Sequence, residues 1–235
     1  MKQAVVLSIA ALALTACSVL PQSAGNSNDR PATRQTTTTD ASPRIASPAP
    51  VARNSADNMC LAELGDAGVR FDPLPDRYLG QGCSTLGTVQ MHALAGDDGR
   101  LDVSNIGPVT CPVSAAFAAW ARFGVDRAAR QIFGSPLASI QTMGSFACRN
   151  VAGSSRRSAH ASADAIDIGG FVLADGRRIS VLEGWKGDSR ERQFLRVVQR
   201  SACRRFGTVL GPDYNAAHHD HFHVEGVIDG NSYCR

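Results

Sequence analysis

Side chains that could bind a metal ion or transfer protons are concentrated in two segments of the chain. Five of the six histidines lie there: His160 in the first segment, and His218, His219, His221 and His223 in the second. The first segment also contains Asp167, seven residues after His160. Imidazole and carboxylate groups are ligands of zinc and also act as general acids and bases. The two segments are therefore the first place to look for a metal centre or a catalytic site.

The second segment has the alternation of a β-strand. In Asp220-His221-Phe222-His223-Val224 the two histidines fall on one face, and Phe222 and Val224 fall on the other. The pattern predicts a strand over residues 221–227. Two imidazoles on one face, backed by apolar side chains, suit metal binding or catalysis.

Asp167 interrupts an apolar run, Ala165 to Leu173, that predicts another strand. Ile166 and Ile168 would fill the core, and Asp167 would point to the opposite face. A carboxylate in such surroundings is costly unless it is paired or bound to a metal ion. After a bend, His160 could reach it. An isolated His-x-His pair would carry little weight, but the joint pattern of His160, Asp167 and His223 indicates a metal site.

The remaining histidines are expected to be structural. His219 is the solvent-facing neighbour of the group, and His92 stands apart in the sequence without a partner.

The elements around these segments indicate an α+β fold: a small antiparallel sheet that carries the site, flanked by helices. Helical spacing of apolar residues predicts helices over residues 113–133 and 189–206. The strand at 165–173 is followed by an Asp-Gly turn, so residues 178–182 should pair back as a hairpin.

Cysteine usage points to an oxidising compartment. Seven cysteines are present. With Cys17 set aside, an even number remains, which predicts three disulfides of open pairing. Those six are Cys60, Cys83, Cys111, Cys148, Cys203 and Cys234. No Cys-x-x-Cys pair occurs among them, which argues against a zinc-thiolate or thioredoxin-type site.

The N-terminus reads as an export signal over residues 1–16, ending in Leu14-Thr15-Ala16-Cys17. This resembles the lipobox of bacterial lipoproteins, in which the cysteine is lipidated; the alternative is an ordinary secretory signal cleaved nearby. Ser18 after the cysteine favours an outer-membrane anchor facing the periplasm of a Gram-negative bacterium. Residues 17–57, rich in Ser, Thr and Pro, would then be a linker, and residues 58–235 the folded domain.

Composition excludes several other classes of protein. Lys and Arg number 24 against 21 Asp and Glu, a net charge of +3 that does not indicate nucleic-acid binding. No apolar run after the signal approaches the roughly 20 residues of a membrane span, so the lipid would be the sole membrane attachment.

The chain resembles the bacterial extensin-like C-terminal domain family. The resemblance rests on Ser158-Ala159-His160-Ala161-Ser162-Ala163-Asp164-Ala165-Ile166-Asp167-Ile168, on His218-His219-Asp220-His221-Phe222-His223, and on further matches at Cys148-Arg149-Asn150, Trp185, Phe194-Leu195-Arg196 and 206–215. The spacing His-x6-Asp and His-x-His is also similar to zinc D-Ala-D-Ala metallopeptidases and murein endopeptidases, the peptidase M15-like group.

This wider resemblance implies that His160, Asp167 and His223 bind Zn²⁺ and that Arg149 contacts the substrate or the transition state. It implies an enzyme of the periplasm that acts on peptidoglycan. The resemblance leaves open whether the cleaved bond is D,D or L,D and whether the action is that of an endopeptidase or a carboxypeptidase. It identifies no activating protein. The general base is open among His221, His218 and Asp220. Where the family pattern has Ser-Glu-His, this chain has Ala159, which removes a carboxylate that could tune the site.

Three other functions compete with the peptidase. A wall-binding lipoprotein could keep the fold without catalysis, although an intact ligand set argues against it. Periplasmic zinc buffering is disfavoured by the small number of ligands. A nucleophilic hydrolase is disfavoured because no Gly-x-Ser-x-Gly motif is present.

Overall fold

The computed structural model describes residues 53–235. The predicted export signal, the predicted lipidation site Cys17 and the part of the predicted linker up to residue 52 lie outside these residues. The first helix begins at Ser55, inside the last part of the predicted linker.

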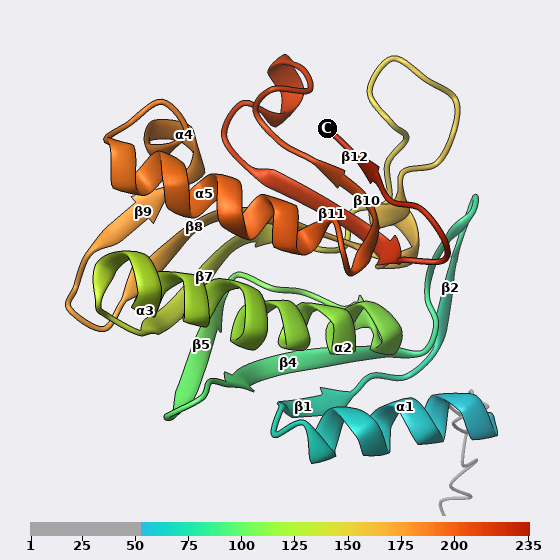
Figure 1. Cartoon of the computed structure of the whole chain (residues 1–235). Helices are drawn as coiled ribbons and strands as arrows, with labels where there is room; N and C mark the ends of the chain where they lie inside the picture. The colour runs from blue at the N-terminus through green and yellow to red at the C-terminus, as the bar shows by residue number, and fades with distance from the viewer. Residues whose placement is uncertain (1–52) are drawn as a thin grey trace, which may run out of the picture. The chain divides into compact units, whose positions relative to one another are not determined.

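The described residues form five α-helices and three other helical segments, of which η1 joins α2 to α3 (Figure 1). The α-helices are α1 (Ser55–Asp66), α2 (Cys111–Trp120), α3 (Arg127–Phe133), α4 (Val181–Gly184) and α5 (Ser189–Ala202). The other helical segments are the π-helix η1 (Ala121–Asp126) and the 3₁₀-helices η2 (Ala159–Ser162) and η3 (Ala216–His218).

The strands are β1 (Arg70–Pro73), β2 (Arg77–Gly80), β3 (Cys83–Thr85), β4 (Thr88–Ala95), β5 (Arg100–Ser104), β6 (Val109–Thr110), β7 (Leu137–Gly144), β8 (Ala165–Leu173), β9 (Arg178–Ser180), β10 (Phe206–Leu210), β11 (Phe222–Val227) and β12 (Tyr233–Cys234).

The main sheet is larger than the small antiparallel sheet expected from the sequence. It has ten strands in the order β1-β4-β5-β7-β8-β11-β10-β12, with β6 paired to β4 and β9 paired to β8. Two of its pairs, β5–β7 and β10–β12, are parallel. Strands β2 and β3 form a separate two-stranded sheet. The α+β class is confirmed. The sequence pattern did not reveal the full size of the sheet, because several of its strands are too short to show a periodic pattern.

The two predicted helices are present. The first is continuous through α2, η1 and α3: it begins two residues early, at Cys111, and ends at Phe133 as predicted. The next residue, Gly134, has a φ of 71°, the left-handed conformation that favours glycine after a helix end. The second, α5, ends at Ala202, and residues 206–210 are strand instead. The Asp188 carboxylate caps α5 by accepting from the backbone N–H groups of Arg190 and Glu191.

The predicted return strand over 178–182 is correct only as far as Ser180. There the chain turns into α4, because the Ser180 side chain accepts from the backbone N–H of Glu183 and caps the helix. The strands predicted over 165–173 and 221–227 are present, the second beginning one residue late at Phe222.

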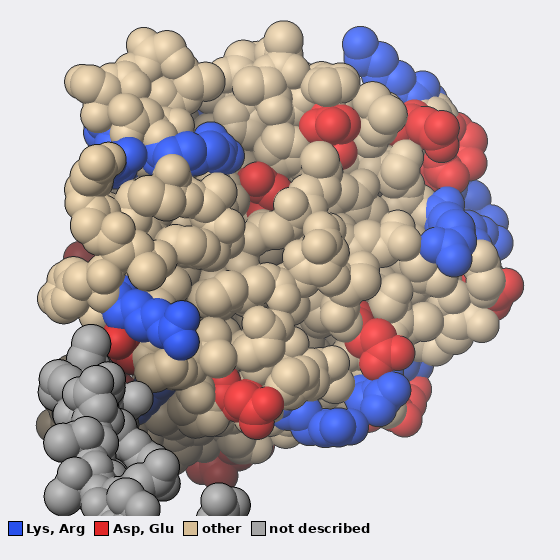
Figure 2. Space-filling model, turned by 180° about the vertical axis from the view of Figure 1, so that it is seen from behind, with Lys and Arg blue, Asp and Glu red and all other residues tan. Residues whose placement is uncertain are grey.

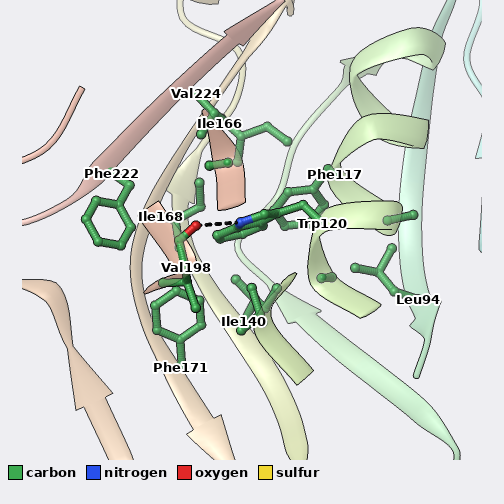
Figure 3. Close-up of a cluster of buried hydrophobic side chains, with 14 of the residues drawn as sticks. Leu94, Phe117, Trp120, Ile140, Ile166, Ile168, Phe171, Val198, Phe222 and Val224 are labelled. Carbon is green, nitrogen blue, oxygen red and sulfur yellow. Dashed lines mark hydrogen bonds between the residues drawn. The ribbon is translucent and has the colours of Figure 1, made fainter. Parts of the chain in front are cut away.

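The core lies between the sheet and the layer formed by α2, α3 and α5 (Figure 1). At its centre, Trp120 is fully buried and donates from Nε1 to the backbone oxygen of Val198 in α5, at 2.9 Å (Figure 3). Ile166 and Ile168 face this cluster from β8. The core thus fixes which face of β8 is apolar and sends the side chain of Asp167 to the other.

Three disulfides join the six cysteines, as predicted. The pairs are Cys60–Cys111, Cys83–Cys148 and Cys203–Cys234. The second joins β3 to the segment that precedes His160. Because it fixes that segment, this disulfide bears most directly on the site described below.

The surface carries charges of both signs. On the face turned away from α2, α3 and α5, basic and acidic side chains are interspersed around broad areas of other residues (Figure 2). Within residues 53–235, no helix has the length and apolar character needed to cross a bilayer.

Replacing Trp120 by alanine should lower the free energy of unfolding by about 3–5 kcal/mol, because the change leaves a cavity and removes the donor to Val198. Urea denaturation of the folded domain measures this. The control is Phe123→Ala on the same continuous helix, where the ring is 44% exposed and the expected loss is below about 1 kcal/mol. Equal losses in the two variants would contradict the described core.

Candidate metal centre

The pairing of β8 with β11 sets Asp167 directly opposite His223. Side chains that face each other in an antiparallel pair have Cβ atoms about 4.5–5.5 Å apart, which is within reach of a carboxylate and an imidazole. The Oδ1 atom of Asp167 lies 2.9 Å from Nδ1 of His223. Two segments far apart in the sequence therefore meet through strand register.

His160 reaches the same point from the short helix η2. Its Nε2 atom lies 3.1 Å from Oδ2 of Asp167 and 3.2 Å from Nδ1 of His223. Its Nδ1 is 3.0 Å from the backbone oxygen of Ser145, which can only accept a hydrogen bond. Nδ1 therefore donates to Ser145, and Nε2 is the nitrogen that faces the cluster.

His160, Asp167 and His223 form a group that could hold a metal ion. One potential ligand atom from each lies within 4.8 Å of the others. His160 and His223 are buried, and Asp167 is only partly exposed. The structure thus brings together the three residues that the sequence pattern selected as metal ligands.

Hydrogen bonds within the cluster favour the charged forms of Asp167 and His223. Burial raises the pKa of Asp167, but the hydrogen bonds with His160 and His223 outweigh burial and hold that pKa well below its ordinary value. Burial also lowers the pKa of His223, but the hydrogen bonds with Asp167 and Glu225 reverse this and raise the pKa to about 9. Without a bound metal ion, His223 is therefore an imidazolium at neutral pH.

Glu225 is a member of the site that the sequence analysis missed. Its Oε2 atom lies 3.2 Å from Nε2 of His223, on the side of the ring away from Asp167. The hydrogen bond with His223, with a contribution from the charge of Arg156, lowers the pKa of Glu225. A carboxylate that accepts from the outer nitrogen fixes the tautomer and orientation of a metal-binding histidine. The signal was present, because His221, His223 and Glu225 continue one period-2 pattern.

His221 and Asp220 form a pair beside the cluster. Nδ1 of His221 donates to Oδ1 of Asp220 at 2.8 Å, and this bond lowers the pKa of the carboxyl group. The other nitrogen, Nε2, faces inward, 3.5 Å from Oδ1 of Asp167. The imidazole thus has a carboxylate on one side and the cluster on the other.

His218 is held differently, without a carboxylate. Its Nδ1 donates to Oδ1 of Asn215 at 2.7 Å, and its ring lies 5.2 Å from that of His221. Burial, together with the charges of His221, His223 and Arg149, lowers the pKa of His218 to about 4. At neutral pH His218 is therefore uncharged, with Nε2 free to accept a hydrogen bond.

The other two histidines lie outside the cluster. His219 is exposed, and its Nδ1 donates to the backbone oxygen of Ala216. His92 has a partner, contrary to the expectation from its sequence position: it lies 2.8 Å from Asp72 across the β1–β4 pair. Both are consistent with the structural role expected of them.

A cavity of about 410 Å³ opens above the cluster. One wall is the segment 149–158, and the other is the loop between β10 and β11, which contains Tyr214, Asn215 and His218. Both segments rise from the same end of the sheet, the first drawn in yellow (Figure 1). Arg149 lines this cavity, as expected for a substrate contact, and so does Arg156, which the sequence analysis did not select.

Fold and site together define a disulfide-linked α+β domain with a buried His-Asp-His cluster at the floor of a cavity. A family model described as "Extensin-like protein C-terminus" matches residues 58–235, and the chain belongs to this family. Neither the curated proteins nor the solved structures gave a match.

Zinc affinity should fall as the pH is lowered below about 9. His223 must lose the proton on Nδ1 to bind a metal ion there, and its pKa in the metal-free protein is raised to about 9. Each unit of pH below that value should therefore weaken binding about tenfold. Competition with a chromophoric chelator between pH 6.5 and 8.5 measures this, and an affinity independent of pH would contradict the loss of a proton from His223 on metal binding.

Glu225→Gln should weaken zinc binding by about 10- to 100-fold, because the amide is a poorer acceptor for Nε2–H of His223. The same competition assay at one pH measures the change. The matched control is Glu183→Gln, an identical replacement on the exposed surface of α4. Equal affinities in the two variants would show that Glu225 does not orient the ligand.

Proposed function

We propose that this protein is a zinc-dependent peptidase that cleaves stem-peptide or crosslink bonds of peptidoglycan in the periplasm. The observation that carries the proposal is the buried His160–Asp167–His223 cluster at the floor of an open cavity, with the His221–Asp220 pair beside it.

The donor set fits zinc. Two imidazole nitrogens and one carboxylate oxygen are ligands that catalytic zinc sites use, and bonds of 2.0–2.2 Å place tetrahedral ligands about 3.3 Å apart. Nε2 of His160 and Nδ1 of His223 lie 3.2 Å apart, and each is 2.9–3.1 Å from one of the two carboxylate oxygens of Asp167. Small adjustments would therefore suffice, since one potential ligand atom from each residue lies within 4.8 Å of the others. The remaining position would face the cavity. Zinc held there would supply Lewis acidity, polarising a carbonyl group and acidifying water.

Among the three candidate bases, the geometry favours His221. Its Nδ1–H is held by Asp220, which fixes the tautomer and aims Nε2 at the cluster. Nε2 would accept a proton from water in the cavity and later donate it to the leaving amine. Asp220 is engaged in orienting His221. His218 has no such carboxylate, and its depressed pKa makes it a weak base, better suited to accept a hydrogen bond from the substrate.

Arg149 supplies positive charge at the cavity wall. Its guanidinium group would stabilise the oxyanion that develops on the scissile carbonyl, or hold a carboxylate of the substrate.

Peptidoglycan is proposed as the substrate on two grounds from the sequence. The predicted export signal and the six paired cysteines suit an extracytoplasmic enzyme. The spacing of His160, Asp167 and His223 is similar to that of the zinc metallopeptidases of the cell wall. A lipid on Cys17 would attach the domain to the outer membrane, within reach of the wall.

A wall-binding lipoprotein without catalysis is the second candidate. Ala159 favours it, since the family pattern has a carboxylate there. The Glu225 carboxylate beside His223 weighs against it, because orienting an imidazole is a requirement of a working metal site.

The folded domain, loaded with zinc, should remove crosslinked muropeptides from purified peptidoglycan, and a chelator should prevent this. Mass-spectrometric muropeptide profiling measures the loss and identifies the bond. Asp167→Ala should lose both zinc and activity. His221→Gln should keep zinc but lose about 10²- to 10⁴-fold in kcat.

Two outcomes would contradict the proposal. Full turnover by Asp167→Ala would exclude the ligand assignment. An unchanged profile from folded, zinc-loaded protein that still sediments with sacculi would favour the wall-binding function.

A further inference from the structure

The cavity wall formed by residues 149–158 carries three arginines with two different arrangements. Arg157 donates to Oδ1 of Asn150 at 2.8 Å and to the backbone oxygen of Gln81, so it holds the segment to the turn between β2 and β3. Arg149 and Arg156 instead line the cavity. The Cys83–Cys148 disulfide fixes the same segment immediately before Arg149.

Neither of these two arginines has an acidic partner within the part of the chain that the structure describes. Neither guanidinium group makes an ion pair or a hydrogen bond there, although the backbone N–H of Arg156 donates to Oγ of Ser154, and both residues are exposed. The carboxylates that line the same cavity already have imidazole partners: Asp167 pairs with His160 and His223, and Glu225 pairs with His223. Two cationic groups therefore remain available to an anionic ligand in the cavity.

The two charges act on different parts of the site. The charge of Arg149 acts on His218, whose ring is next to that of His221, whereas the charge of Arg156 acts on Glu225. The antiparallel bridge between Asn150 and Arg157 makes Arg149 and Arg156 diagonal neighbours, with backbones roughly 7–8 Å apart. With long side chains on both, two anionic groups on the order of 10 Å apart could be held at the same time.

We propose that the site selects peptides with two carboxylates, one held by Arg149 and the other by Arg156, so that the peptide lies across the metal cluster. The proposal rests on the proposed function in taking the ligand to be a peptide. An extended peptide covers about 3.3 Å per residue, so the two carboxylates would be separated by about three residues. Guanidinium groups bind carboxylates through paired hydrogen bonds, which gives the selection its geometry.

The probe is the synthetic peptide γ-D-Glu-L-Lys-D-Ala-D-Ala, whose two carboxylates are those of the D-Glu residue and of the C-terminus. It is compared with its two single amides and its double amide. Binding is measured by calorimetry on the folded domain with a chelator present, so that no peptide is hydrolysed. Each amidation should weaken binding about fivefold, as expected for exposed charge pairs.

Variants assign each carboxylate to one arginine. Arg149→Gln should abolish the preference for one free carboxylate, and Arg156→Gln should abolish the preference for the other. The matched control is Arg200→Gln, which removes an exposed arginine of α5 that does not line the cavity, and it should keep both preferences. Circular dichroism verifies that each variant is folded.

Equal binding of the four peptides by the unaltered domain would overturn the inference. So would variants at Arg149 and Arg156 that lose affinity equally for all four peptides, because that would show general attraction without selection. Cleavage of peptidoglycan by the zinc-loaded domain, together with equal binding of the four peptides in the presence of chelator, would overturn this inference alone. Carboxylate-dependent binding of the peptides, together with no cleavage of peptidoglycan by the zinc-loaded domain, would contradict the proposed function and leave the inference in place.

Discussion

A carboxylate placed in the middle of an apolar strand constrains much of this structure. Asp167 lies between Ile166 and Ile168, which pack in the core near Trp120. A slip of one residue in the register of β8 would bury the carboxylate among apolar side chains and expose the isoleucines. The observed register instead pairs Asp167 with His223 and brings it to His160. Burial alone would favour the neutral acid, so these two imidazoles are what keep Asp167 ionised and suited to a metal ion.

The cluster needs rigid surroundings, and they come from distant parts of the chain. The segment before His160 is tied to β3 by the Cys83–Cys148 disulfide, and Ser145 at the end of β7 accepts from His160. On the other wall, Asp213 accepts from Nε1 of Trp185 and pairs with Arg196, which holds the start of the loop that delivers His218. The site is therefore positioned by a disulfide and by buried or partly buried hydrogen bonds, while the two cavity arginines remain free for ligands.

The sequence was sufficient to predict the centre of this arrangement. Strand periodicity predicted β8 and β11 and the faces of Asp167 and His223, and the cysteine count predicted three disulfides. Glu225 continued the same period-2 pattern and could have been found. The Ser145 contact could not, because it uses a backbone oxygen, which any residue supplies. Arg156 lies in an irregular loop without periodicity, and strands as short as β6 and β12 give too few residues for a pattern, which is why the sheet proved larger than expected.

The central claim is that His160, Asp167 and His223 together bind zinc. Crystallographic diffraction from the zinc-loaded domain on both sides of the zinc absorption edge tests it most directly. The account predicts one anomalous peak bonded to Nε2 of His160, a carboxylate oxygen of Asp167 and Nδ1 of His223, at about 2.0–2.2 Å from each. A peak at other residues, or crystals of the zinc-treated domain with no peak at this cluster, would contradict the account.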